Sequence, residues 1–364
     1  MFSSLSRAVA SRRHIVNAIS PSTLQDLLSV QTQWLSLRYS TSIPSNRPSF
    51  TVSYLVDTFG FSFDDATSIS KYVNLETREK PDLVVSFLKN QGFSHAQIVR
   101  FIREVPVCLR FDPVKTFLPK IEFFKSKGVS SSDIPKVISS CPNIMKRSLS
   151  KQIEPSFDFF RNLVKSDDMF VNIVKEYSGI LLDINTHAVP NLKVLREVGV
   201  PESNIIKLLK TFPRALTKVP PRFKEIVEEV KKLGFHPSST LFVWAVYTLT
   251  SLSKSTWAKK SEAYKKWGWS DNDILLAVRR FPFCMKISED KIDVTMEFLV
   301  NNMGCESSAV LRYPQILSLS LNKRIVPRAS VFQVLLSKGL VKQKSSLAIF
   351  VYTETIFMNR ANEE

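Results

Sequence analysis

Residues 199–216 read GVPESNIIKLLKTFPRAL, and this stretch decides the fold. It opens with a glycine and an apolar residue, continues with isoleucine and leucine at helical spacing, and stops at Phe212-Pro213. Proline has no backbone N–H and cannot continue a helix, whereas glycine readily takes the left-handed conformation that ends one. The stretch therefore predicts a helix that lies between a glycine stop and a proline stop.

The glycine of this stretch belongs to a register that runs along the chain. Eight of the nine glycines end an apolar-rich stretch and precede an apolar residue or cysteine, and their successive spacings are 32, 36, 71, 35, 34, 36 and 35 residues. The spacing of 71 covers two periods and contains one degenerate unit near Lys165-Ser166. A fixed period of this kind indicates a repeat architecture. The eight glycines are Gly60, Gly92, Gly128, Gly199, Gly234, Gly268, Gly304 and Gly339.

A second register consists of X-Pro pairs, each about fourteen residues after a glycine. Each proline is expected to stop a first helix, after which a turn leads into a second helix that ends at the next glycine. Two copies are degenerate, with Ser178 and Thr248 in the place of proline. Ser94 with Gln97, and Ser270 with Asp273, have the spacing of helix-capping boxes. The register prolines are Pro106, Pro142, Pro213, Pro282 and Pro314, and Pro119, Pro155 and Pro327 are expected early in second helices.

The predicted fold is all-α, a helical-repeat solenoid (superhelix) of seven to eight units of about 35 residues. Each unit reads helix, proline-stopped turn, helix and glycine, and buries its apolar face on its neighbours. Alternating strand patterns are absent. The array is expected over residues 50–350, preceded by a transit peptide (1–39) and a linker (40–49), and followed by a C-terminal tail (351–364).

The N-terminal segment has its own composition. Residues 1–49 contain five arginines, twelve serines and a single acid, Asp26. This pattern is typical of an organelle transit peptide, with processing expected near Tyr39. The arginine content favours the mitochondrial matrix, with the chloroplast as the alternative, and a basic tail without a targeting role is the remaining interpretation.

The charge balance points to an acidic partner. Lys and Arg number 50 against 33 Asp and Glu, a net charge of +17. Removal of residues 1–39 takes away four arginines and one aspartate, a net of +3, and leaves +14. Nucleic acid is favoured over anionic membrane or acidic protein, because its charge density suits many dispersed cations. The most apolar stretch, residues 241–252, is too short to span a membrane.

Motifs for catalysis or metal binding are absent from the sequence. It contains no GxGxxG, Walker A, HExxH or GxSxG string. Its four cysteines lack the spacing of a zinc site and are expected to be free thiols in a reduced compartment. The acid pairs at residues 64–65 and 167–168 suit helix starts. We therefore expect no enzyme, no cofactor, no metal and no small-molecule substrate.

The combined glycine and proline registers resemble the mTERF family, the mitochondrial transcription termination factor-like proteins, and in particular its plant-type organellar members. The clearest copies are residues 92–109, 199–216 and 268–285, and the resemblance covers about residues 50–345. It implies two α-helices and a short 3₁₀ turn per unit, with nucleic acid along a basic face. It also implies a role in organellar transcription termination or initiation, intron splicing or ribosome biogenesis. Because the founding activity of the family is on duplex DNA, double-stranded DNA is favoured and RNA is the alternative.

Basic residues follow the repeat period. The position nine residues after each register proline or its substitute is Lys or Arg in five of seven units, where random placement would give about one. The seven residues are Lys115, Lys151, His187, Arg222, Trp257, Lys291 and Lys323. These positions lie near the start of each second helix, where free N–H groups and the helix dipole also favour phosphate. The candidate nucleic-acid-binding residues are Arg110, Lys115, Lys146, Arg147, Lys151, Arg214, Lys218, Arg222, Trp257, Lys286, Lys291, Lys323, Arg324 and Arg328.

Two alternatives remain open at the sequence level. The basic stripe can be a solvated outer face of the repeat, and the array can be a scaffold that binds protein. Trp257 is retained as a candidate for base stacking, whereas most other aromatic residues are expected in the core. The favoured hypothesis is a regulator of mitochondrial gene expression that binds nucleic acid.

Overall fold

The computed structural model describes residues 49–182, 184–339 and 347–363. The chain forms two compact units, one ending at Arg78 and the other spanning Glu79–Glu364. The expected transit peptide and nearly all of the expected linker lie outside the described residues. Over the described ranges the elements are helices and turns, without a strand, which confirms the all-α prediction.

The first unit is a helical hairpin. Helix α2 (Phe50–Phe59) ends at Gly60, which has a φ of 71°, and α3 (Phe63–Ser70) follows. The buried Thr51 hydroxyl accepts from the backbone N–H of Leu75 (2.8 Å) and so ties the start of α2 to the segment after α3. This unit carries the first glycine of the repeat register.

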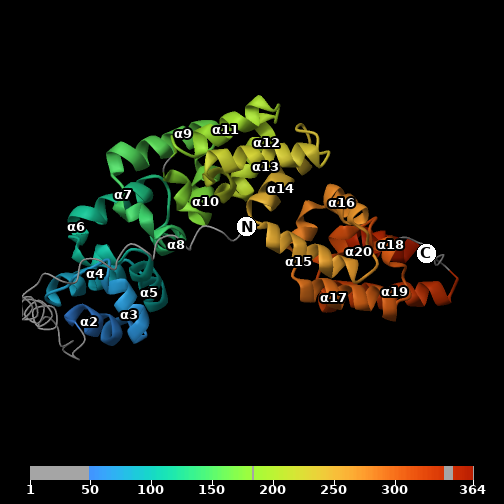
Figure 1. Ribbon diagram of the computed structural model, residues 1–364, viewed down its shortest axis with the longest axis horizontal. Helices are drawn as coiled ribbons and strands as arrows, with labels where there is room; N and C mark the ends of the chain where they lie inside the picture. Colours follow the sequence, from blue (N-terminus) through green and yellow to red (C-terminus); the bar gives the residue numbers. More distant parts are fainter. Residues whose placement is uncertain (1–48, 183, 340–346, 364) are drawn as a thin grey trace, which may run out of the picture. The chain divides into compact units, whose positions relative to one another are not determined.

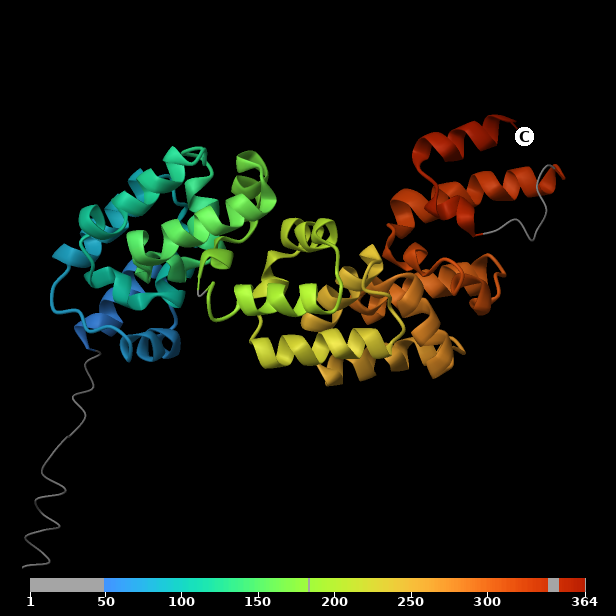
Figure 2. The ribbon, with the colours of Figure 1, turned by 90° about the horizontal axis from the view of Figure 1, so that it is seen from above.

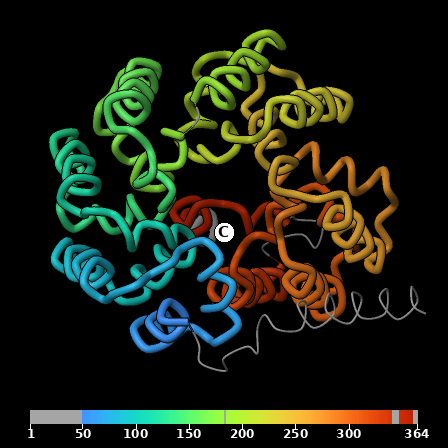
Figure 3. Tube along the Cα trace, turned by 60° about the vertical axis from the view of Figure 1, so that its left-hand side comes forward, coloured from blue at the N-terminus to red at the C-terminus, as the bar shows by residue number. Residues whose placement is uncertain are grey.

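The second unit repeats one pattern of first helix, turn and second helix (Figures 1 and 3). The first helices are α5 (His95–Glu104), α8 (Ile134–Ser140), α10 (Asp167–Glu176), α12 (Glu202–Thr211), α14 (Thr240–Thr250), α16 (Asp271–Arg280) and α18 (Ser307–Val310). The second helices are α4 (Glu79–Asn90), α7 (Leu118–Ser126), α9 (Glu154–Val164), α11 (Ala188–Glu197), α13 (Pro220–Lys232), α15 (Lys254–Lys265), α17 (Glu289–Glu297) and α19 (Val326–Ser337).

Shorter elements join these helices. The 3₁₀ turns that follow the first helices are η1 (Pro106–Arg110), η2 (Pro142–Lys146), η4 (Ser178–Leu181), η5 (Pro213–Thr217), η6 (Pro282–Lys286) and η8 (Pro314–Ser318). Extra turns flank some second helices: α6 (Pro113–Thr116) and the π-helical η3 (Leu149–Ile153), η7 (Phe298–Asn302) and η9 (Leu321–Ile325). The sequence pattern does not predict these extra turns.

The glycine stops are confirmed. All eight register glycines have positive φ, from 67° at Gly304 to 93° at Gly128. Lys165 is the non-glycine residue with positive φ among the described residues, at 57°, and it ends α9 where the degenerate unit was expected. A lysine in this conformation is strained relative to glycine, because its Cβ crowds the backbone.

The proline stops are also confirmed, and the two degenerate copies differ from each other. Ser178 still opens a 3₁₀ turn, because its hydroxyl donates to Val137 O (2.7 Å) and its N–H donates to Ser140 Oγ (2.9 Å). Thr248 instead lies inside α14, which continues to Thr250. Threonine keeps the N–H that a helix needs, so nothing in the backbone stops the helix at this position.

The elements stack in three rows within the second unit. First helices contact the next first helix, as α8 contacts α10 and α10 contacts α12, and second helices do likewise, as α11 contacts α13. The turns form a row of their own, in which η2 contacts η4, η4 contacts η5 and η6 contacts η8. In the unit without a turn, α14 contacts both η5 and η6. Neighbouring helices of this unit can be followed side by side in Figures 1 and 2.

Buried polar side chains tie the rows together. Lys120 in α7 donates to Met145 O at 3.0 Å, and Asn191 in α11 donates to Leu216 O at 2.9 Å. Tyr264 in α15 donates to Cys284 O at 2.9 Å. In each case a second helix donates to a carbonyl of the 3₁₀ turn in the following unit, where the helix itself provides no partner. Successive repeats are therefore joined by hydrogen bonds as well as by apolar packing.

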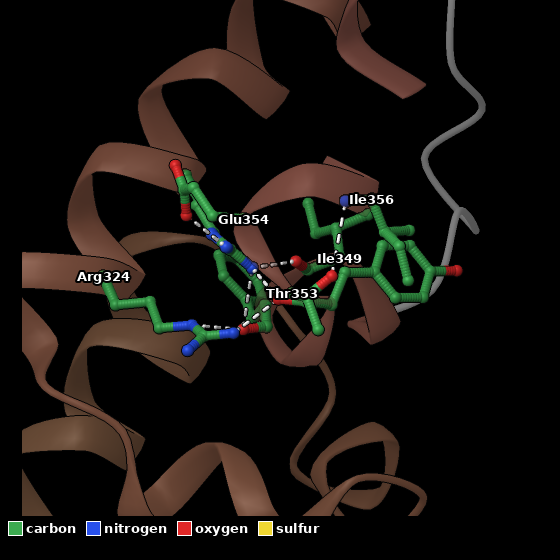
Figure 4. A network of polar contacts seen from close by, with 8 residues as sticks. Arg324, Ile349, Thr353, Glu354 and Ile356 are labelled. Carbon is green, nitrogen blue, oxygen red and sulfur yellow. Dashed lines mark hydrogen bonds and ion pairs between the residues drawn. The ribbon is translucent and has the colours of Figure 1, made fainter. Parts of the chain in front are cut away.

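The segment expected as a C-terminal tail is helical in the structure. Helix α20 (Ala348–Val351) is followed by α21 (Glu354–Glu363), and the Arg328 guanidinium of α19 donates to Glu354 at 2.6 Å. Figure 4 shows Arg324 directed at the carbonyls between α20 and α21, with Glu354 nearby. None of the described helices is long and apolar enough to cross a membrane.

Candidate nucleic-acid interface

The basic stripe has a defined place in the helices. Lys115, Lys151, Lys291 and Lys323 are each the third residue of a helical segment, the N3 position, and Arg222 is the third residue of α13. We call these five residues the N3 row. His187 is the residue before α11, and Trp257 is the fourth residue of α15, so these two lie out of step with the row.

The capping geometry corrects one part of the sequence interpretation. The side chains of Ser148, Ser288 and Ser320 accept from the backbone N–H of Lys151, Lys291 and Lys323. Asp112 does the same for the N–H of Lys115, at 3.2 Å. These N3 amides are therefore not free for phosphate, and the anion-binding capacity of the row lies in its side chains.

A cation at N3 is unfavourable for the helix that carries it. The N-terminus of a helix carries partial positive charge, so Lys or Arg in the first turn destabilises the helix by roughly 0.3–1 kcal/mol. The chain nevertheless places such a cation in the first turn of two second helices, α13 and α17, and in three of the short turns that precede second helices, α6, η3 and η9. The helix dipole does not account for this recurrence.

Several candidate cations are exposed and available. The side chains of Arg110, Lys146, Lys151, Lys218 and Lys323 are exposed and make no hydrogen bond or ion pair with any residue in the described ranges. Lys115 is 85% exposed, and its nearest acid is Asp112 with 3.9 Å between Nζ and Oδ2. An exposed pair at that distance contributes little, which leaves Lys115 available as well.

Other candidates already have partners within the protein. Arg222 donates to Glu225 at 2.9 Å across an exposed pair. Lys286 donates to the Tyr247 hydroxyl (3.1 Å) and to Ser251 Oγ (2.8 Å), while Lys291 donates to Ser318 O (2.6 Å). The last bond also places the N3 position of one unit beside the 3₁₀ turn of the next. Arg147 is half-buried and has a partner of its own.

Arg324 and Arg328 do not belong to the exposed surface. Arg328 is 3% exposed, and its Nη1 donates to the carbonyls of Ile349 (2.9 Å) and Tyr352 (2.6 Å). Arg324 donates to Phe350 O at 3.1 Å (Figure 4). Their donors bind carbonyls of α20 and of Tyr352, which follows it. The burial of Arg328 does not fit the expected surface position, because residue type and sequence position do not show where a side chain points, whereas contact of the half-buried Arg324 with nucleic acid stays a prediction.

The structure adds aromatic residues that sequence analysis assigned mainly to the core. The residue before each 3₁₀ turn is aromatic and half-buried in several consecutive units, as at Tyr177, Phe212 and Phe281, and Tyr247 holds the equivalent position in α14. Phe212 and Tyr247 stack with ring centroids 3.5 Å apart. Two of these rings make cation–π contacts. The guanidinium carbon of Arg214 lies 4.5 Å from the centroid of the Tyr177 ring, and Nζ of Lys286 lies 4.3 Å from the centroid of the Tyr247 ring. Periodicity in the X-Pro register is the signal that identifies these rings.

Trp257, the candidate for base stacking, is half-buried in α15.

The cysteines and acids offer no second site in the described ranges. All four cysteines are free, and burial raises the pKa of the Cys284 thiol to about 12. Asp64 and Asp167 lie in the first turns of their helices, as expected for acids that suit the helix dipole. The described residues contain no cluster of three or more His, Cys, Asp or Glu that could hold a metal ion.

This geometry defines a helical-repeat protein with exposed cations at the starts of its second helices. The mTERF family model matches residues 85–248 and 246–357, most of the chain, and the protein belongs to this family of non-enzymatic nucleic-acid-binding proteins.

Two similar proteins come from Arabidopsis thaliana. The chain is 22% identical over 207 residues to the transcription termination factor MTERF15, mitochondrial, which covers 48% of this chain and 46% of that protein. It is 23% identical over 139 residues to the transcription termination factor MTERF8, chloroplastic, which covers 38% of this chain and 28% of that protein. The chain therefore spans less than half the length of either relative in these matches.

Proposed function

We propose that this protein binds double-stranded DNA in an organelle and regulates transcription there, with the mitochondrion favoured over the chloroplast. The N3 row carries the proposal. It repeats a cation at the third residue of five helical segments that begin or precede second helices, where the helix dipole opposes it. A polyanion with regularly spaced phosphates is the partner that such a row suits.

The state of the aromatic rings favours a duplex over a single strand. Proteins that bind single strands without sequence preference expose aromatic faces on which bases stack. In the described ranges, the exposed aromatic side chains Phe50, Phe63, Tyr72 and Phe159 lie outside the 3₁₀ turns and the N3 positions. Among the half-buried rings of the turn row, Phe212 stacks on Tyr247, and Tyr177 and Tyr247 make cation–π contacts with Arg214 and Lys286.

The comparisons support the cellular role at family level. Both relatives are named transcription termination factors, one mitochondrial and one chloroplastic. The arginine-rich segment before residue 49 favours the mitochondrion. Termination or another form of transcriptional regulation is therefore the proposed role.

A crosslinking experiment tests the proposal in the cell. The tagged full chain is located by fractionation, crosslinked in isolated mitochondria and immunoprecipitated, and the DNA and RNA are sequenced separately. Discrete peaks on mitochondrial DNA support transcriptional regulation. Peaks confined to an intron or ribosomal RNA would replace it with RNA processing, and recovery of neither nucleic acid would favour a protein-binding scaffold.

A further inference from the structure

The chain has one glycine outside the glycine register, and its surroundings explain it. Gly179 is the second residue of η4 and lacks the positive φ of the eight register glycines. A Cβ at this position would lie 2.4 Å from Cζ and 2.6 Å from the hydroxyl oxygen of Tyr177. Glycine therefore leaves room for the Tyr177 ring in this position, and a side chain at residue 179 would displace the ring.

The opposite side of this arrangement is an arginine. The guanidinium carbon of Arg214 lies 4.5 Å from the centroid of the Tyr177 ring, in the geometry of a cation–π contact. The Arg214 side chain is exposed and donates to no acceptor in the described part of the chain. A planar guanidinium held on a ring loses less conformational freedom when its N–H groups bind a ligand. The Tyr177 ring therefore restrains the Arg214 side chain, whose N–H groups make no hydrogen bond within the described residues.

Arg214 differs in this respect from most arginines near the repeat edges. Arg161 and Arg196 are neutralised by Asp167 and Glu202, at 2.6 Å in both cases. Arg222 is paired with Glu225. Arg110 is exposed but has no ring beneath it among the described contacts. Of these, Arg214 alone combines a supporting ring with unused donors.

The location of Arg214 is on the row of turns. It lies in η5, whereas Tyr177 directly precedes η4, and η4 contacts η5. Burial raises the pKa of the Cys141 thiol, as does the carboxylate of Glu104, and the positive charge of Arg214 opposes this rise. Arg214 therefore lies on the row of turns.

We propose that Arg214, supported by Tyr177 and Gly179, reads the edge of a guanine in the DNA that the N3 row binds. The inference rests on the proposed duplex binding. Guanine presents two acceptors, O6 and N7, in the major groove, and a guanidinium can donate to both at once. Lysines of the N3 row are point charges that contact phosphates and carry no sequence information. Arg214 therefore provides sequence specificity, and Tyr177 and Gly179 act as residues that position its guanidinium.

Binding-site selection from random double-stranded DNA tests this assignment with the full chain. Wild-type protein is compared with Arg214→Lys, Gly179→Ala and the matched control Arg196→Lys, since Arg196 is paired with Glu202. Each selected base pair is then changed in turn, and affinity is measured by fluorescence anisotropy at one salt concentration. Arg214→Lys keeps the charge but loses the paired donors. Gly179→Ala changes no charge and displaces only the ring.

The expected result is a selected motif with a guanine at which Arg214→Lys and Gly179→Ala both lose discrimination, by about 5- to 150-fold. Affinity for unselected duplex and the preference of Arg196→Lys stay unchanged. Retention of the guanine preference by Arg214→Lys, or selection of no motif by a wild-type protein that binds duplex, would overturn the inference and leave duplex binding standing. Failure to bind any duplex would overturn both.

Discussion

The hydroxyl of Ser148 accepts a hydrogen bond from the backbone N–H of Lys151, with 3.2 Å between nitrogen and oxygen. At this helix start the capping Ser148 and the cation Lys151 are three residues apart. The backbone N–H of Lys151 has a hydrogen-bond partner, and its ammonium group is exposed. Ser288 and Ser320 cap their helices in the same way. A residue that only stabilised a helix at this position would be acidic, because an acid suits the dipole and completes a capping box.

Replacing Lys151 with glutamate should therefore have opposite effects on stability and binding. We expect the free energy of unfolding to rise by about 0.5–1 kcal/mol, because the charge then suits the helix N-terminus. We expect duplex affinity to fall and its salt dependence to weaken by about one phosphate contact. Urea denaturation and fluorescence anisotropy measure the two quantities. The matched control is Lys125→Glu in the last turn of α7, which should destabilise the protein slightly and leave binding unchanged.

Replacement of Arg328 by methionine should affect stability alone. The change removes the donors that serve Ile349 O, Phe350 O and Tyr352 O, and it removes the partner of Glu354. Unsatisfied acceptors of this kind cost about 2–3 kcal/mol. Amide hydrogen exchange should show faster exchange in α20 and α21. A loss of DNA affinity in the folded variant would return Arg328 to the set of nucleic-acid ligands.

Lys165 offers a stabilising substitution. Its φ of 57° is unfavourable for any residue with a Cβ, so Lys165→Gly should raise the free energy of unfolding by about 1 kcal/mol. The converse change, Gly199→Ala, should lower it by about 1–2 kcal/mol, because Gly199 has a φ of 88°. Chemical denaturation of both variants measures the difference. Equal stability of wild type and Lys165→Gly would show that the αL conformation carries no strain here.

The hydrogen bond from Tyr264 to Cys284 O should be measurable by itself. Tyr264→Phe removes the buried donor and leaves the carbonyl of the η6 turn unsatisfied, at a cost of about 1–2 kcal/mol. The control is Tyr72→Phe, since Tyr72 is 74% exposed and its change should leave stability unaltered. Similar free energies of unfolding for the two variants would show that the hydrogen bond from Tyr264 to Cys284 O does not stabilise the contact between successive repeats.

Local chemistry made the boundaries of the repeats predictable. Glycine and proline act on their own backbone, so the ends of α12 follow from Gly199 and Pro213 without knowledge of the partner helices. The capping boxes at Ser94 and Ser270 are equally local and are both present. The turn at Ser178 was harder to anticipate, because its hydrogen bonds come from α8, about 40 residues earlier.

The candidate site was predictable only in part. The period of the N3 row is visible in the sequence, and the exposure of Lys115, Lys151 and Lys323 agrees with a surface row. The inward direction of Arg328 and the ring beneath Arg214 depend on packing between units, which residue spacing does not contain. Contact of the row with nucleic acid stays a prediction.

The salt dependence of duplex affinity tests the central claim, that the N3 row binds phosphates, most directly. The full chain is compared with a variant in which Lys115, Lys151, Arg222 and Lys323 are replaced by glutamine; Lys291 is kept because it bonds to Ser318 O. The logarithm of the association constant should fall less steeply with the logarithm of salt, by about 3.6 for four lost contacts. An unchanged slope at unchanged helicity would contradict the claim and make the row a solvated face of the repeat.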